Sequence, residues 1–146
     1  MKYPLYTILV LATCISLYCC TPSKEFPEHY KGEQIQFGQG GGFSGMITHY
    51  SLLDDGRLFQ KVARDTNFTF TENWDKPFVK QMFKNFHELG LDKLNHYHPG
   101  NLYYFIEYHS PDKPTHRISW GQTGYTPDEN VIAFYNLLYR STKAKS

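Results

Sequence analysis

The side chains that could do chemistry in this chain are its seven histidines, its three cysteines and one pair of adjacent aspartates. His96 and His98 are the tightest histidine cluster, and two imidazoles at alternate positions of a strand would share one face. A zinc site needs three or four ligands at defined spacings. No HExxH or CxxC motif and no third histidine in register accompanies this pair, and the Pro99-Gly100 step that follows favours a loop. We therefore expect no metal and no other cofactor.

The adjacent carboxylates Asp54 and Asp55 resemble an acid–base pair, but they immediately precede Gly56. Neighbouring residues of a tight turn point to different sides, and turn chemistry explains both aspartates without catalysis. The chain also has no GxSxG motif and no cysteine left free for nucleophilic attack once the N-terminal one is acylated. The sequence thus predicts no catalytic residue and no enzymatic activity.

A glycine-rich run could cradle a phosphate. A P-loop would need a lysine followed by serine or threonine, whereas the last glycine here is followed by Phe43-Ser44-Gly45. A dinucleotide fingerprint would need a helix next, and the pattern that follows is that of a strand. We therefore interpret the run as a flexible connection and a possible interaction loop, with Phe43 entering the core and Gly45 marking a bulge or close crossing. The candidate loop consists of Gly38, Gln39, Gly40, Gly41, Gly42, Phe43 and Gly45.

The three cysteines follow an apolar stretch at the N-terminus. One lysine precedes residues 5–18, which contain no charge, and small and polar residues follow. This layout is typical of a secretory signal, and the apolar run is shorter than the roughly 20 residues of a spanning helix. Lipoprotein signals place a cysteine directly after the cleavage site, with leucine favoured three residues earlier. Cys20 has Leu17 at that place, so we expect residues 1–19 to be a signal peptide and Cys20 to carry a lipid.

Two other cysteines are alternatives. Cleavage before Cys19 would put Ser16 at the favoured leucine position and bulky Tyr18 next to the cut. Cys14 follows Leu-Ala-Thr, but its use would leave an apolar mature N-terminus. An uncleaved anchor and an ordinary secretory signal are the remaining alternatives.

Removal of residues 1–19 leaves 127 of the 146 residues, with Cys20 as the only cysteine. No disulfide can then form within the domain, so its stability must come from a hydrophobic core. The full chain has 15 Lys and Arg against 14 Asp and Glu, and loss of Lys2 balances them. Zero net charge disfavours nucleic acid as a partner and broad adhesion to anionic lipid. We expect a cell-envelope protein whose lipid binds a membrane, the outer membrane being favoured, with an envelope protein or a protease as a further partner.

The spacing of apolar and turn residues predicts the first half of the fold. Residues 20–33 have two prolines and mixed charge, which indicates the lipidated cysteine and a tether. The predicted strands, with a tight turn at 54–56, form a three-stranded antiparallel meander over 34–37, 43–52 and 57–62. Residues 66–75 fit either a loop or a weak strand.

The second half adds two helices and two strands. Apolar residues of 76–89 share one helical face, with Asp75 as a candidate N-cap and Gly90 as a stop. Strands are expected at 102–109 and 115–120, joined by a turn at 110–114. A capping box at Thr126–Glu129 begins the closing helix. The order β-β-β-α-β-β-α predicts an α+β domain over 34–142, an antiparallel sheet of about five strands with two helices on one face, and a disordered tail at 143–146.

The segment Phe37–Gly45 reads FGQGGGFSG and is followed later by Trp120-Gly121 and a capped helix. Over about residues 34–140 the chain resembles a recurrent type of small Bacteroidota lipoprotein with an F-G-x-G-G-G-F-[ST]-G signature near the mature N-terminus. It is more distantly similar to emfourin-type inhibitors of thermolysin-like metalloproteases, which have a Gly-Gly-Phe-Ala-Gly turn in a small α+β domain. Gly41, Gly42, Phe43 and Gly45 match that motif, and Ser44 replaces its alanine.

These observations favour a non-enzymatic binding module on the cell envelope. The resemblance implies, as one alternative, that residues 38–42 present their backbone to a protease cleft. A second alternative is a small-ligand carrier whose aromatic sheet face lines a pocket with Tyr103, Tyr104, Tyr108 and Trp120. The competing interpretation is that these aromatic side chains are simply core and rim.

Overall fold

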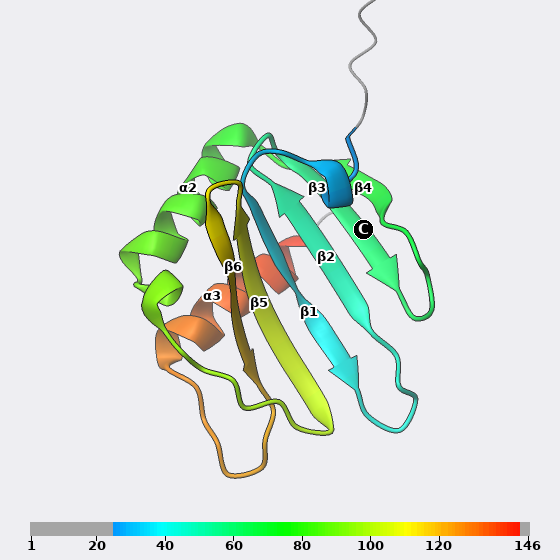
Figure 1. Cartoon of the computed structure of the whole chain (residues 1–146), viewed down its shortest axis with the longest axis vertical. Coiled ribbons are helices and arrows are strands. Elements are labelled where there is room, and N and C mark those ends of the chain that lie inside the picture. The colour runs from blue at the N-terminus through cyan, green and yellow to red at the C-terminus, as the bar shows by residue number, and fades with distance from the viewer. Residues whose placement is uncertain (1–24, 144–146) are drawn as a thin grey trace, which may run out of the picture.

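The chain folds into one curved sheet with two helices on one of its faces. The computed structural model describes residues 25–143. Its strands pair antiparallel throughout, in the order β4-β3-β2-β1-β5-β6 (Figure 1). The strands are β1 (Gln34–Gly41), β2 (Thr48–Leu53), β3 (Arg57–Val62), β4 (Thr69–Asn73), β5 (Leu102–Ser110) and β6 (Lys113–Trp120). The helices are α2 (Lys76–Glu88) and α3 (Glu129–Ser141), with short 3-10 turns η1 (Pro27–His29) and η2 (Leu91–Lys93). The expected α+β class is confirmed.

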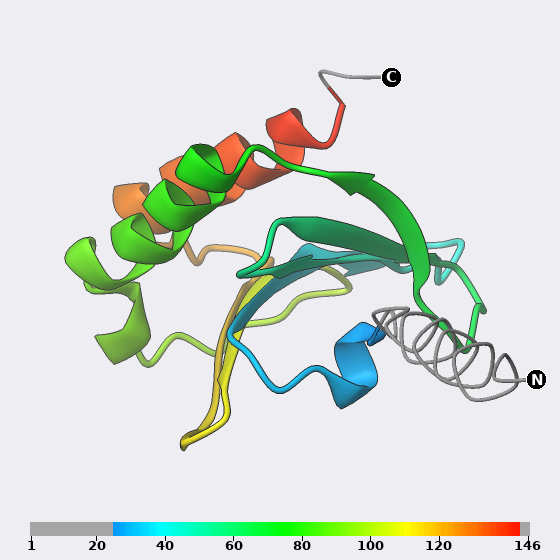
Figure 2. The ribbon, with the colours of Figure 1, turned by 90° about the horizontal axis from the view of Figure 1, so that it is seen from above.

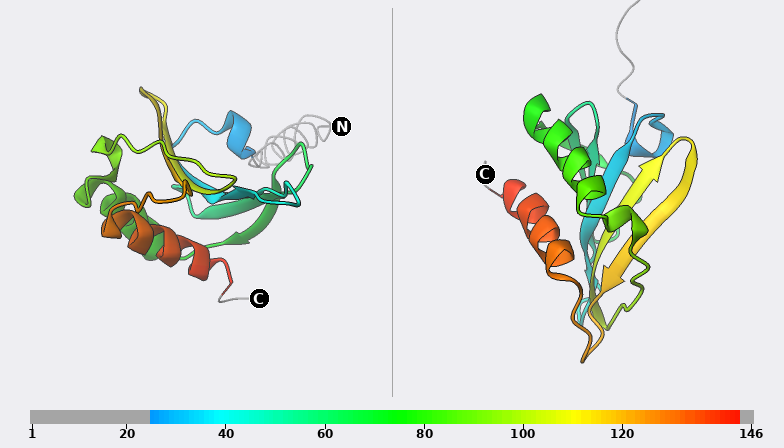
Figure 3. Two further views of the ribbon diagram at one scale, coloured as in Figure 1. Left: turned by 90° about the horizontal axis from the view of Figure 1, so that it is seen from below. Right: turned by 90° about the vertical axis from the view of Figure 1, so that its left-hand side faces the viewer.

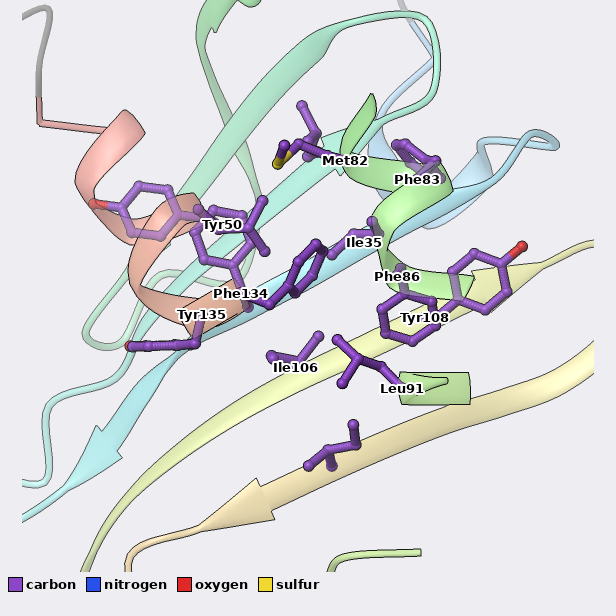
Figure 4. Close-up of a cluster of buried hydrophobic side chains, with 14 of the residues drawn as sticks. Ile35, Tyr50, Met82, Phe83, Phe86, Leu91, Ile106, Tyr108, Phe134 and Tyr135 are labelled. Atoms are coloured by element: carbon purple, nitrogen blue, oxygen red, sulfur yellow. The ribbon is translucent and has the colours of Figure 1, made fainter. Parts of the chain in front are cut away.

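Helices α2 and α3 lie side by side on one face of the sheet, while η1 lies against the other face (Figures 2 and 3). The main core fills the space between helices and sheet. There Ile35 and Ile106 of the sheet meet Phe86 of α2 and Phe134 of α3, and all four side chains are at most 2% exposed (Figure 4). The Phe86 ring stacks on Tyr108 with centroids 5.0 Å apart. Removing a side chain of this size from such a core would cost about 3–5 kcal/mol.

The helices begin and end close to where the apolar spacing predicts. Residues Val79, Met82 and Phe86 form the buried stripe of α2, and Gly90, with φ of 67°, ends it. The prediction of a capping box at Thr126 is wrong. The N-cap of α3 is Asp128, whose carboxylate accepts a hydrogen bond from the backbone N–H of Asn130 at 2.8 Å. An aspartate one position before the first helical residue reaches that N–H more directly than a threonine two residues earlier.

The sheet has six strands in the described residues, one more than the approximate five expected. The additional strand is β4, which resolves the ambiguous segment 66–75 as an edge strand beside β3. The β5–β6 hairpin is also longer than predicted. Pro114 belongs to β6, so only residues 111 and 112 remain between the two strands.

The first strand is the largest departure from expectation. The prediction that residues 38–42 form a flexible connection is wrong for Gly38–Gly41, which continue β1 to its end. These residues pair with β5 as far as Gly41↔Leu102, and Gly38 and Gln39 also pair with β2. The second strand correspondingly begins at Thr48 instead of residue 43, and residues 42–47 form the turn between β1 and β2.

The segment at residues 25–33, here called the N-terminal strap, packs on the sheet, although residues 20–33 were predicted to be a tether. Pro27 is buried and its carbonyl accepts a hydrogen bond from Gln34 Nε2 at 2.9 Å. The Arg57 guanidinium donates to the carbonyl of Glu25 at 2.9 Å and lies 5.5 Å from the centre of the Tyr30 ring. Residues 25–33 therefore belong to the folded domain.

The strap covers a second, smaller apolar cluster on the face without helices. Leu53, Phe59 and Phe68 form this cluster, with Tyr30 packed against it. The predicted signal peptide, the lipidation site Cys20 and tail residues 144–146 lie outside the described residues. Within residues 25–143 no helix is long and apolar enough to cross a membrane.

Candidate functional site

The predicted interaction loop divides into two parts with different surroundings. Gly38, Gln39, Gly40 and Gly41 lie within β1, between β2 and β5. Gly42, Phe43 and Gly45 lie in the β1–β2 turn, residues 42–47, at the end of the domain opposite to the β2–β3 turn (Figure 1).

The strand glycines are required by close neighbours. A Cβ atom on Gly38 would lie 2.0 Å from the carbonyl oxygen of Thr48, and one on Gly41 would lie 1.9 Å from that of Asn101. Contacts this short with backbone atoms cannot be relieved by a side-chain rotation. At Gly40 the obstacle is the hydroxyl of Tyr103, whose ring lies over the strand. These glycines thus allow neighbouring backbone and side chains to pack directly on β1.

The turn glycines have a different role, because nothing lies within 4 Å of a Cβ built on Gly42 or Gly45. Their φ values of 73° and 60° are in the left-handed region that glycine adopts most easily. The backbone N–H of Gly42 donates to Asn101 O at 2.8 Å, and that of Gly45 donates to Gly42 O at 3.2 Å. Both glycines therefore shape the turn and tie its first residue to the chain that leads into β5. Gly45 lies outside β2, so the prediction of a bulge within that strand is wrong.

Phe43 is fully exposed to solvent, so the prediction that it enters the core is wrong. The glycine turn holds it beyond the end of the β1–β2 pairing, where no core side chain can reach it. Met46 and Ile47 in the same turn are 54% and 37% exposed. The sequence analysis did not predict that these two residues are exposed in a turn, because their spacing suits a strand and a strand was predicted there.

The face of the sheet without helices carries a buried polar layer that the sequence analysis also missed. Gln34, Gln36 and Ser51 are at most 9% exposed. Gln34 Oε1 accepts hydrogen bonds from Gln36 Nε2 at 3.1 Å and from the Ser51 hydroxyl at 3.2 Å. Gln36 Oε1 lies 2.8 Å from Nε2 of His49. Alternating polar residues in the strand sequences were the available signal, but alternation alone indicates solvent exposure.

His49 is the most perturbed titratable group of this layer. Its ring makes edge contacts with Phe68 and Phe105, with centroids 5.0 Å away in each case. Burial, and secondarily the positive charge of Lys61, lower the pKa of His49 from 6.5 to about 4. His49 is therefore neutral at pH 7 and donates its Nε2 proton to Gln36.

Charged side chains of β5 and β6 continue the polar layer towards the edge of the sheet. Glu107 lies 2.8 Å from Nε2 of His109 and accepts a hydrogen bond from Arg117 at 2.6 Å. Burial raises the pKa of Glu107, but His109 and Arg117 outweigh it and hold the pKa below its usual range. Arg117 also lies 4.5 Å above the Phe105 ring. Both carboxylate oxygens of Glu107 are therefore paired within the sheet face.

The histidine pair of the sequence analysis lies beside the final segment of β6. The chain at Tyr97 forms a parallel bridge to Ser119. His96 Nδ1 is paired with the hydroxyl of Tyr125, and the His98 ring stacks on the same tyrosine at 3.9 Å. Among residues 25–143 no three His, Cys, Asp or Glu side chains come together in a way that could hold a metal ion.

The four aromatic residues considered for a carrier pocket do not face a common space. Tyr108 and Trp120 are 3% and 8% exposed within the core beneath the helices, and Tyr104 packs against the same core. Tyr103 projects from the opposite face, because successive residues of a strand alternate. Three of the four are therefore core side chains.

The aspartate pair has structural partners as well. Asp54 accepts hydrogen bonds from the Tyr30 hydroxyl and from the backbone N–H of Glu33, and Asp55 forms an ion pair with Arg57 at 2.8 Å. Both aspartates thus hold the strap and the β2–β3 turn. No family model matches the chain, and no curated protein compared with it matches either.

Proposed function

We propose that this chain is a lipid-anchored protein of the cell envelope, attached to a membrane through Cys20, whose folded domain is a non-enzymatic binding module. The proposed contact surface is the β1–β2 turn. The outer membrane is the proposed location. A protein of the envelope is the proposed partner.

The observation that carries the binding part of this proposal is the full exposure of Phe43, whereas the anchor rests on the N-terminal sequence pattern. A phenylalanine side chain that stays in water forgoes roughly 2–3 kcal/mol of favourable burial energy. Two glycines at positive φ nevertheless hold it outward. A preorganised turn that displays an aromatic side chain is typical of binding surfaces, where aromatic anchors contribute most of the affinity.

Anchoring is tested separately from binding. Mass spectrometry of the full chain expressed in a lipoprotein-processing host is expected to find cleavage after residue 19 and acyl groups on Cys20. Cys20→Ser is expected to lose both the acyl groups and the cleavage after residue 19, so that mass spectrometry finds the chain intact from residue 1. Acylation or cleavage after residue 19 that persists in this variant would contradict anchoring at Cys20.

Binding is tested by co-purification of the lipidated full chain from envelope fractions. Phe43→Ser is expected to lose its specific partner at least tenfold, because removal of a central aromatic anchor typically costs 2 kcal/mol or more. Leu137→Ser, which alters another exposed apolar residue on α3, is the matched control and is expected to retain the partner. Equal recovery with both variants would refute a contact through the turn.

A second candidate function is inhibition of a thermolysin-like metalloprotease. The residues that match the inhibitor motif, Gly41, Gly42, Phe43 and Gly45, are those that build the end of β1 and the exposed turn. Full-length protein without effect on a panel of such proteases, at concentrations up to the micromolar range, would exclude this function.

A further inference from the structure

The β1–β2 turn is one part of a larger surface without charge. No Asp, Glu, Lys or Arg occurs in residues 34–53, 94–106 or 118–127, although charged residues make up 20% of the chain. These three segments are far apart in the sequence.

Hydrogen bonds bring the three segments together at one end of the domain. Gly42 donates to Asn101, the residue before β5. His98 donates to the carbonyl of Ser119 at 2.9 Å, and Gln122 donates to the carbonyl of His98 at 3.0 Å. The β1–β2 turn, the start of β5 and the segment after β6 consequently lie side by side, at the lower end of the domain in Figure 1 and in the right-hand view of Figure 3. We call this surface the uncharged end.

Large apolar side chains are concentrated at the uncharged end. Five of the nine exposed large apolar residues in the described part of the chain lie there, namely Phe43, Met46, Ile47, Tyr97 and Leu102. They come from two of the three segments, and the third contributes small and amide residues, Gly121-Gln122-Thr123-Gly124. Soluble domains seldom gather exposed apolar side chains in this way unless the surface binds something.

We infer that the uncharged end binds an apolar, uncharged pocket on another protein, with Phe43 as the inserted side chain and Leu102 contributing to the surrounding contact. This inference rests on the proposed function and adds to it the extent of the surface and the chemistry of the partner. The three segments themselves supply no ion pairs, so their contact must come from apolar burial and hydrogen bonds. The nearest exposed charges are Arg64 and Asp65, which follow Ala63, whose backbone N–H donates to the carbonyl of Ile47 at 2.7 Å.

A lipid bilayer is a poorer match for the same surface. Residues 42–47 lie outside the strand pairing, and irregular backbone exposed to the hydrocarbon region leaves its peptide groups without partners. The three segments of the uncharged end have no lysine or arginine to attract anionic headgroups, and the neighbouring Arg64 is followed at once by Asp65. A protein pocket can satisfy both the aromatic side chain and the backbone around it.

The position of the strap agrees with a partner away from the anchoring point. Glu25 contacts Arg57, at the end of the sheet where β1 starts, and β1 then runs through eight residues to Gly41. Seven strand steps correspond to about 23 Å. The described chain therefore enters at one end of the sheet and presents the uncharged end at the other.

Site-specific photo-crosslinking tests the inference. The full chain carries p-benzoylphenylalanine at position 43, at 102 or, as a control, at 137, and is irradiated in its native envelope. Positions 43 and 102 are expected to give the same protein adduct, with at least fivefold less from position 137. Excess unlabelled wild-type chain is expected to suppress the adduct, whereas Phe43→Ser chain is not. Raising NaCl from 0.1 M to 1 M is expected to change the yield less than twofold, because screening weakens only charge interactions.

Several results would overturn the inference while leaving the proposed function intact. These are an adduct from position 43 that position 102 does not share, a yield that falls tenfold in 1 M NaCl, or no adduct while Phe43-dependent co-purification persists. Flotation of the Cys20→Ser chain with phosphatidylethanolamine–phosphatidylcholine vesicles, lost in Phe43→Ser, would assign the surface to lipid instead. Circular dichroism melting of each variant verifies that it is folded.

Discussion

The buried imidazole of His49 is expected to make the stability of this domain depend on pH. The perturbation is a fall in pH from 7.5 to 4.0. In the folded protein the pKa of His49 is about 4, lowered mainly by burial and then by Lys61, whereas in the unfolded chain it is near 6.5. The unfolded state therefore binds a proton at a higher pH than the folded state does.

The sign and size of the effect follow from these two values. Stability from the neutral imidazole is fully present above pH 6.5 and is lost as the pH falls from 6.5 to 4. Each unit of pKa difference corresponds to about 1.4 kcal/mol, so the loss at pH 4 is about 3 kcal/mol. That is a large fraction of the 5–15 kcal/mol by which domains are typically stable.

Urea unfolding of the full chain at pH 7.5, 6.0, 5.0 and 4.0 measures the loss, with His49→Gln as the comparison. Glutamine can still donate a hydrogen bond to Gln36 but does not titrate. The variant is expected to be less stable at pH 7.5, because it lacks the ring contacts with Phe68 and Phe105. Between pH 7.5 and 4.0 the wild type is expected to lose about 3 kcal/mol more than the variant.

Parallel pH profiles for the two proteins, within about 0.5 kcal/mol, would refute this reasoning. So would an NMR titration that places the pKa of His49 near 6.5. Either result would mean that water reaches the imidazole or that the unfolded state does not gain the proton. Subtracting the pH-dependent loss of the variant from that of the wild type removes the contribution of the carboxylates, because both proteins carry the same ones.

Three further predictions concern single positions. Gly38→Ala is expected to lower the free energy of unfolding by about 3 kcal/mol, since its Cβ would lie 2.0 Å from a carbonyl oxygen of β2. Gly45→Ala adds only the cost of a positive φ and is expected to lower it by about 1 kcal/mol. Urea unfolding of both variants measures the difference. Arg57→Gln is expected to release the strap and to speed tryptic cleavage after Lys31 several-fold, and unchanged cleavage would count against the strap contacts. Asp128→Ala should remove the N-cap of α3 at a cost of about 1 kcal/mol in the same unfolding assay.

Local chemistry alone was sufficient for much of the fold. Apolar spacing placed α2 within one residue of its observed end, and Gly90 does stop it. The β2–β3 turn and the strand Arg57–Val62 lie where predicted. Such features depend on neighbours three or four positions away in a helix, or on the φ values that a turn requires, so the sequence states them directly.

Segments without a side-chain signal needed the tertiary structure. Glycine suits a flexible loop and a crowded strand equally well, and only the approach of Thr48 and Asn101 determines that Gly38 and Gly41 belong to β1. The strap shows the same limitation, since its hydrogen bonds with Arg57 and Asp54 join residues more than twenty positions apart in the sequence.

The glycines in the sequence located the candidate site, but they did not reveal that its aromatic residue is exposed. The sequence by itself determined the uncharged composition of three segments and the class of fold, and the lipid anchor at Cys20 stays a prediction. Only the tertiary structure decided that Phe43 lies in water and that the three segments share one end of the domain. The physical reason is that alternation reveals which side chains share a face of a strand, whereas burial depends on what the rest of the chain places over that face.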